Sequence, residues 1–284
     1  MDNEPMRRFS LQGRTALVTG GTQGVGAAIC QALAAAGANL LIHGLRQDAA
    51  SEATLAACRA FGGEADLLLA DLAEPGPAAA VRLGDEARAR RPELDLLVNN
   101  AGTYIDQPFL EMEAERFEKT MQLNVHAPFY LTQRLTRRWV AEGTAGRVLF
   151  TGSINGQLSE ADHVAYDASK GAIGAMVRSL CVALAPHRIR VNALAPGLVR
   201  TPLTAPAIDD PAFGAWMRLH TPSGEVPDAE VCGETAVFLL SEAARHIHGQ
   251  TLLVDGGMSV WQQPDLPAEL RDAVERLPEA RSGN

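Results

Sequence analysis

The chain has 284 residues, of which 46% are hydrophobic and 21% charged, and its formal net charge is −9 at pH 7. This is the composition of a globular protein and argues against a disordered or fibrous one, while the negative charge argues against nucleic acid as a partner. We find no hydrophobic signal region at the start and no apolar run long enough to cross a bilayer, so we expect a cytoplasmic protein without a membrane partner.

Strand-like apolar runs alternate with helical patterns along the chain. The predicted strands are 14–20, 38–44, 64–71, 94–99, 147–152, 189–195 and 250–255. The predicted helices are 25–36, 48–61, 76–90, 113–142 with an interruption, 163–185 and 228–241. Such alternation predicts the α/β class, with a doubly wound parallel sheet of seven strands and helices on both faces.

The chain reads as a single domain over residues 1–284, because no shift in composition and no internal repeat divides it. Two segments stand outside the alternation. Residues 197–227 hold five prolines and one helical candidate, 211–219, and a long irregular insertion of this kind predicts a substrate lid. The polar tail at 262–284 has at most one helix, 268–277.

A glycine-rich turn, Thr19-Gly20-Gly21-Thr22-Gln23-Gly24-Val25-Gly26, joins the first strand to the first helix. Glycines permit a tight turn and let a pyrophosphate approach the backbone, and the following helix offers it free N–H groups. The spacing is TGxxxGxG rather than GxGxxG. An ordinary strand-to-helix turn is the alternative, but the position after the first strand of a βαβ series favours nucleotide binding.

Further motifs follow in order along the chain. They are Asn99-Asn100-Ala101-Gly102, Asn124, Ser153, the Tyr166-xxx-Lys170 pair, Pro196-Gly197 with Val199 and Thr201, and Asp255-Gly256-Gly257. Together with the glycine turn, this series resembles the short-chain dehydrogenase/reductase family in its compact, single-domain form, from about residue 13 to 261. The resemblance implies a Rossmann-type fold, a nicotinamide cofactor and a dimer or tetramer built on the long helices at 113–142 and 163–185.

Tyr166 and Lys170 are four residues apart, so on a helix they lie on one face. A nearby ammonium should lower the pKa of the phenol, which is about 10 in a free tyrosine. A helix-surface pair is the alternative, but 23 of the 25 basic residues are arginine and only Lys119 and Lys170 are lysine. The compact ammonium is therefore expected to matter at position 170. The resemblance implies the catalytic set Asn124, Ser153, Tyr166 and Lys170, with Tyr166 as general acid/base.

The adenosine end of the cofactor site decides between NADP and NAD. An acid at the end of the second strand normally holds the ribose of NAD. Here Gly44 takes that place, Arg46 follows, and Asp48 is expected to cap the next helix. We expect NADP, with NAD left open. The expected cofactor-binding residues are Gly20, Thr22, Gln23, Gly24, Val25, Gly26, Arg46, Asp71, Leu72, Asn99, Ala101, Gly102, Tyr166, Lys170, Pro196, Gly197, Val199 and Thr201.

The substrate is less well defined. Ser153, Tyr166 and Tyr104 are the candidate contacts, and a small-molecule alcohol or ketone is the expected partner. No metal site is expected, and the four cysteines are expected to be reduced. The expected function is an NAD(P)-dependent oxidoreductase that interconverts a secondary alcohol and a ketone. The alternatives are a catalytically silent nucleotide-binding regulatory homologue and a non-redox dehydratase or epimerase.

Overall fold

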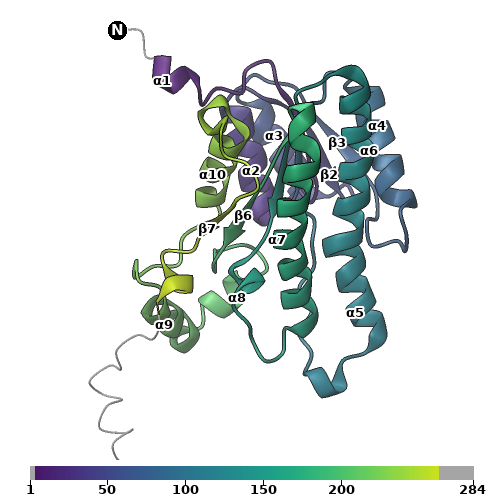
Figure 1. Cartoon of the computed structure of the whole chain (residues 1–284). Coiled ribbons are helices and arrows are strands. Elements are labelled where there is room, and N and C mark those ends of the chain that lie inside the picture. The colour runs from purple at the N-terminus through teal and green to yellow at the C-terminus, as the bar shows by residue number, and fades with distance from the viewer. Residues whose placement is uncertain (1–3, 262–284) are drawn as a thin grey trace, which may run out of the picture.

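A computed structural model describes residues 4–261, and the tail with its expected helix at 268–277 lies outside the described residues. Seven parallel strands form one sheet in the order β3-β2-β1-β4-β5-β6-β7 (Figure 1), which confirms the predicted fold class. The strands are β1 (Thr15–Val18), β2 (Asn39–Gly44), β3 (Ala65–Leu69), β4 (Leu96–Asn99), β5 (Arg147–Thr151), β6 (Arg190–Pro196) and β7 (Thr251–Val254).

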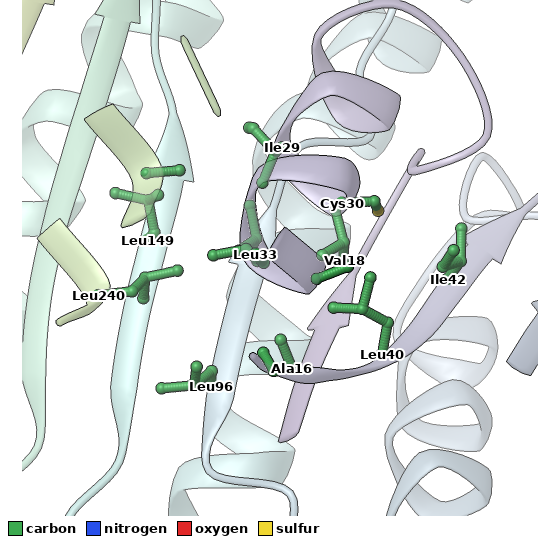
Figure 2. Close-up of a cluster of buried hydrophobic side chains, with 14 of the residues drawn as sticks. Ala16, Val18, Ile29, Cys30, Leu33, Leu40, Ile42, Leu96, Leu149 and Leu240 are labelled. Carbon is green, nitrogen blue, oxygen red and sulfur yellow. The ribbon is translucent and has the colours of Figure 1, made fainter. Parts of the chain in front are cut away.

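The sheet is buried on both faces, and strand β1 shows why its sequence is apolar without alternation. Ala16 and Val18 belong to a core cluster that is shared with helices α2 (Gly24–Ala35) and α10 (Glu230–Leu240) (Figure 2). Leu17 points to the opposite face, into a second cluster. Each strand residue therefore needs an apolar side chain, whichever face it occupies.

Helices α4 (Ala78–Arg90), α6 (Ala127–Glu142) and α7 (Val164–Leu184) contribute the side chains of this second cluster. Helix α3 (Ala49–Arg59) packs beside α2 on the first face. Strand β1 has β2 on one side and β4 on the other, so the direction of winding reverses between β1 and β4. Ligands of doubly wound sheets bind at the carboxyl ends of the strands at this point.

The interruption predicted within 113–142 is a segment of π-helix. Helix α5 (Ala114–Met121) leads into η2 (Gln122–His126), which has π geometry, and α6 continues from there. Asn124 lies in the π segment and is buried. Single π turns inside α-helices are frequent at functional sites because the widened turn redirects a side chain.

The lid segment holds more helix than expected. Helix α9 (Pro211–His220) matches the candidate at 211–219, and Asp210 caps it by accepting a hydrogen bond from Phe213 N at 2.8 Å. Helix α8 (Ala205–Ile208) was not predicted, since four residues are too short to show a period. Other short elements were also missed: α1 (Glu4–Arg7), η1 (Phe109–Glu111), η3 (Ile154–Gly156), η4 (Ala185–His187), η5 (Glu242–Ala244) and η6 (Met258–Val260).

Helix α7, with its continuation η4, corrects one expectation about hydropathy. The stretch Val164–His187 is long and apolar enough to span a bilayer by length and composition alone. However, the helix packs along β6 in the α/β fold, with Ile173 and Val177 in the second core cluster. One face of the helix is thus covered by the sheet, and apolar side chains such as Val182 remain exposed on the other side.

Candidate active site

The glycine turn folds tightly against the loop that follows β4. Gly20 has φ +60°, and a Cβ on it would lie 2.9 Å from Ala101 Cα. A Cβ on Gly26 would lie 2.0 Å from the carbonyl oxygen of Gly20. Both positions therefore require glycine, the first for its dihedral angle and both for the close approach of two backbone segments.

The amino end of α2 is open to an anion. Gln23 occupies the N-cap in extended geometry, and its side chain makes no capping hydrogen bond. The first N–H groups of the helix thus have no side-chain acceptor, and the helix dipole adds partial positive charge. This geometry fits the pyrophosphate of a dinucleotide. Val25 packs its side chain against the first core cluster, so it would meet a cofactor through backbone groups. The backbone oxygen of Thr22 already accepts a hydrogen bond from Thr54 Oγ1.

Asn100 is a positioning residue that the sequence analysis passed over. Its Nδ2 donates to Gly20 O at 3.0 Å, and its Oδ1 accepts from Thr151 Oγ1 at 3.1 Å. Thr19 Oγ1 accepts the N–H groups of both Asn100 and Ala101. These bonds tie the glycine turn to β4 and β5. The Asn99-Asn100 pair was visible in the sequence, but only the fold distinguishes the two residues.

The side chain of Asn99 contacts α6. It is buried, and its Nδ2 donates to Thr132 Oγ1 of α6 at 2.9 Å. Its Oδ1 is buried and has no hydrogen-bond partner in the structure. The side chain therefore fastens α6 to the sheet, and a contact with cofactor through this residue stays a prediction.

Asn124 connects three segments of the site. Its Oδ1 accepts from Thr103 N at 2.8 Å, and its Nδ2 donates to Thr103 O at 2.9 Å and to Ser169 Oγ at 3.0 Å. A Cβ on Gly102 would lie 3.2 Å from Asn124 Oδ1. The π segment, the loop after β4 and α7 are thus held together by one amide. Its side chain is engaged within the protein, and participation in a proton relay stays a prediction.

Ser153, Tyr166 and Lys170 come together at the carboxyl end of β5. Ser153 follows β5, and its side chain lies near enough to the Tyr166 hydroxyl to lower the pKa of that group. Lys170 lies one turn beyond Tyr166 on α7, with Nζ 5.4 Å from the centroid of the tyrosine ring. The ammonium donates to Thr151 O at 2.9 Å and is only 8% exposed. The three side chains form one group, as the sequence predicted.

The pKa of Tyr166 is raised, whereas the sequence analysis expected the Lys170 ammonium to lower it. Burial raises this pKa above the ordinary value, and the nearby Ser153 side chain acts in the opposite direction. Burial also lowers the pKa of Lys170 to about 8. The ammonium points at Thr151 O rather than at the phenol oxygen, so burial decides the result. Tyr166 is a neutral phenol at pH 7 in this structure, which is the form that donates a proton.

Tyr104 stands over the catalytic tyrosine. Its ring meets the ring of Tyr166 edge-on, with the centroids 5.1 Å apart, and it is 40% exposed. The Tyr104 hydroxyl hydrogen-bonds His163 Nε2. Burial first, and then nearby Asp106, raises the pKa of Tyr104. His163 was not predicted, because nothing in its local sequence shows that it reaches a residue 59 positions away.

Arg46 is free to move at the adenosine end. Its side chain is 79% exposed and donates through Nε to Asp48 Oδ2 at 3.1 Å. Asp48 caps α3 by accepting from Ser51 N at 3.0 Å, which confirms the expected cap. A Cβ on Gly44 would lie 2.6 Å from Thr22 Cγ2, so an acid could enter at Gly44 only if Thr22 moved.

Asp71 and Leu72 follow β3 as expected. Asp71 is exposed and accepts from Ala73 N at 2.8 Å, which is a local turn rather than a cap of α4. Leu72 is buried against the second face of the sheet. A contact of this pair with adenine stays a prediction.

The lid segment meets the glycine turn through Thr201. A Cβ on Gly24 would lie 3.4 Å from the Thr201 side chain, and Val199 is buried in the first core cluster. Pro196 ends β6, and Gly197 passes so close to Asp255 that a Cβ on it would lie 2.9 Å from the aspartate Cβ. Of the predicted residues after β6, Thr201 therefore borders the glycine turn, and Gly197 borders Asp255 after β7.

His43 is a further positioning residue that the sequence analysis missed. Its Nδ1 accepts from Gly20 N at 3.2 Å, and its Nε2 lies 3.1 Å from Ala70 O. A ring that accepts at Nδ1 must carry its proton at Nε2 and donate it to Ala70 O. Burial lowers the pKa of His43, with the hydrogen bond to Ala70 opposing. The neutral ring bridges the glycine turn and the end of β3.

Stability should consequently fall as the pH drops below about 6.5, the ordinary value for histidine. The folded state keeps His43 neutral, whereas the unfolded state takes up a proton, so protonation favours unfolding. We expect the difference in Tm between the native protein and the His43→Gln variant to shrink from pH 7.5 to 5.5. Thermal unfolding at several pH values measures this, and the exposed His246→Gln variant is the control. A constant difference would contradict the bridging role.

Comparisons with known proteins agree with this geometry. A family model described as "Enoyl-(Acyl carrier protein) reductase" matches residues 20–259. The chain is 32% identical over 249 residues to glucose 1-dehydrogenase of Gluconobacter oxydans, which covers 88% of this chain and 93% of that protein. It is 33% identical over 252 residues to 5-keto-D-gluconate 5-reductase of Escherichia coli, covering 89% of this chain and 98% of the relative.

Among solved structures, a gluconate 5-dehydrogenase from Burkholderia cenocepacia in complex with NADP and tartrate superposes with a TM-score of 0.83. It is 33% identical and covers 90% of this chain and 99% of its own. The likeness therefore extends over nearly the whole of both molecules, including the segments that form the site described above.

Proposed function

The chain belongs to the short-chain dehydrogenase/reductase family, and we propose that it is an NADP-preferring enzyme that interconverts a secondary alcohol and a ketone on a small, sugar-like substrate. Its cofactor is NADP or NAD, and its reaction is an oxidation or reduction at a CH–OH or keto group. One observation supports the mechanism above the others: Ser153, Tyr166 and Lys170 form a single group at the sheet edge that carries the open amino end of α2.

The chain's own side chains supply the proton chemistry. Tyr166, as a neutral phenol, donates its proton to the carbonyl oxygen during reduction and accepts it back during oxidation. Ser153 hydrogen-bonds the same oxygen, and the Lys170 ammonium stabilises the tyrosinate that forms. A bound nicotinamide would supply or accept the hydride.

Two other functions are open to the same fold: a silent nucleotide-binding regulator, and a non-redox dehydratase or epimerase. The intact group of Ser153, Tyr166 and Lys170 favours redox chemistry over both. A panel of ketoses, keto acids and simple ketones with NADPH tests the proposal. Consumption of one NADPH per ketone supports it, whereas binding of NADPH with no turnover, or turnover with no net loss of NADPH, would contradict it.

The preference for NADP depends on Arg46. A guanidinium can meet a 2′-phosphate with two parallel N–H bonds, and no acid at Gly44 opposes the phosphate. The side chain is exposed and held only by Asp48, so it can turn toward the ribose. We expect Arg46→Ala to weaken NADPH binding by about 1.5–3 kcal/mol, the range for a hydrogen bond to a charged group, and to change NADH binding little.

Fluorescence titration with both cofactors measures this effect. Arg82→Ala is a matched control, because Arg82 of α4 makes a similar exposed ion pair with Glu74. Equal affinity of the native protein for NADPH and NADH, unchanged by Arg46→Ala, would show that Arg46 is a surface charge only. We prefer this variant to Gly44→Asp, since an acid at 44 would also displace Thr22.

We also propose a homotetramer, with a homodimer as the alternative, assembled through α6 and α7. A groove of about 340 Å³ between these helices is lined by apolar side chains that include Phe129, Val140 and Leu180. Val182 is 77% exposed on the same helix of high hydropathy. A second copy would cover this surface. Light scattering should give a mass of two or four chains, and a mass near 30.2 kDa would contradict the proposal.

A further inference from the structure

Three carboxylates, Asp106, Glu160 and Asp167, lie near the Tyr104–Tyr166 pair. His163, which hydrogen-bonds Tyr104, has its Nε2 3.4 Å from Asp106 Oδ1 and its Nδ1 3.3 Å from Glu160 Oε2. Asp167 lies directly after Tyr166, and the side-chain amide of Asn155 joins it to Glu160. Asp106 and Glu160 are 56% and 62% exposed, so these two charges are open to the solvent beside the Tyr104–His163 pair.

The side-chain amide of Asn155 lies among these acids, and its nitrogen already donates to two of them. Asn155 Nδ2 donates to Glu160 Oε1 at 3.2 Å and to Asp167 Oδ1 at 2.9 Å. The backbone N–H of Glu160 also donates to Asp167 Oδ2, at 3.1 Å. The Asn155 amide and the Glu160 N–H therefore already donate to the protein's own carboxylates. A negatively charged group on a substrate would find no free hydrogen-bond donor among them.

The arginines of residues 197–227 are not paired with these three carboxylates. Arg200 is paired with Asp209, and the Arg218 guanidinium lies along its own helix beside Gly214. Lys170 is at the site, but its ammonium is buried against Thr151 O. The three carboxylates outnumber the single ammonium beside Tyr166, that of Lys170. After burial, Asp106 and Glu160 raise the pKa of Tyr104. Asp167 and Glu160 also raise the pKa of Tyr166, against the opposing effect of Ser153.

Resting on the function proposed above, we propose that this acidic wall, Asp106, Glu160 and Asp167, restricts the enzyme to uncharged sugars and polyols and excludes sugar acids. A carboxylate on the substrate would approach like charges, and no arginine among the described residues forms an ion pair with these three acids. At separations of several ångströms near a protein surface, a pair of such exposed charges together changes an affinity by about tenfold. The chain would then differ in substrate class from the relatives whose names refer to gluconate.

A matched substrate pair tests this directly. D-glucitol and D-gluconate share their carbon chain and the configuration of their secondary alcohols, and differ in the charge at one end. We expect kcat/KM for NADP-dependent oxidation to be at least tenfold higher for glucitol. Raising the ionic strength from 10 to 300 mM should narrow the ratio, because salt screens exposed charges. Gluconate used as well as glucitol would overturn the proposal.

The double variant Asp106→Asn/Glu160→Gln should reduce the ratio of glucitol to gluconate by about tenfold, because it removes the two exposed charges of the wall. Glu86→Gln is the control, since it removes an equally exposed acid on α4, outside the site. An unchanged ratio in the double variant, or an equal change in the control, would overturn the proposal.

A binding measurement separates failure of this proposal from failure of the proposed function. If the panel of carbonyl compounds shows no turnover, the redox function is wrong. The shift in Tm of the protein with NADP, on addition of glucitol or gluconate, then still reports which of the two enters the site. A larger shift with glucitol that becomes equal in the double variant would support the acidic wall, and a larger shift with gluconate would overturn it.

Discussion

Replacing Tyr166 with Phe is expected to lower kcat by at least about a hundredfold, the usual contribution of a positioned general acid or base. The change removes one hydroxyl and keeps the ring, so the edge-on contact with Tyr104 and the position of Lys170 over the ring can persist. Only the proton donor is lost. The affinity for NADPH should therefore stay nearly unchanged. Steady-state kinetics on the best substrate of the panel, with fluorescence titration of NADPH, give both values.

Tyr104→Phe is the matched control for this variant. It removes a second hydroxyl from the same pocket, one that is bound to His163 rather than placed beside Ser153. We expect it to raise KM more than it lowers kcat, because Tyr104 would contact the substrate without transferring a proton. If Tyr166→Phe kept more than about a tenth of kcat, or if Tyr104→Phe lost as much, the proton donor would have to be sought elsewhere.

Local sequence was sufficient to predict the sheet, because each signal acts over a few residues. An unbroken apolar run such as 96–98 predicts burial on both faces of the sheet, and in β4 Leu96 and Val98 belong to the first core cluster and Leu97 to the second. Asp48 was expected to cap a helix, and it does. The interruption within 113–142 appears as the π segment that contains Asn124. In each case the physical cause is contained in neighbouring residues.

The site was predicted less completely, because its supporting bonds join residues far apart in the chain. His43 reaches Gly20 across 23 positions, and Asn100 reaches the same residue across 80. A buried histidine and a second asparagine have no local pattern that distinguishes them from ordinary core residues. The pKa of Tyr166 was also out of reach, since its direction depends on how deeply the fold buries the phenol and where the Lys170 ammonium points.

The second large effect is expected from replacing Lys170 with Arg, which tests the size and shape of the cation rather than its charge. Lys170→Arg keeps a positive charge but replaces a compact ammonium by a planar guanidinium. The native side chain is 8% exposed and its Nζ donates to Thr151 O at 2.9 Å, so the larger group has no room to keep the same position. We expect both turnover and NADPH affinity to fall, each by more than tenfold.

The other lysine of the chain supplies the control. Lys119 is exposed on α5, and Lys119→Arg should leave kcat, KM and cofactor affinity unchanged. The contrast matters because 23 of the 25 basic residues are arginine, so a lysine retained at a buried position points to a requirement that arginine does not meet. A tenfold loss of rate corresponds to about 1.4 kcal/mol of transition-state stabilisation. If Lys170→Arg kept more than a tenth of the native activity, any cation would serve at this position, and the assignment of Lys170 as the residue that stabilises the tyrosinate of Tyr166 through its compact ammonium would fail.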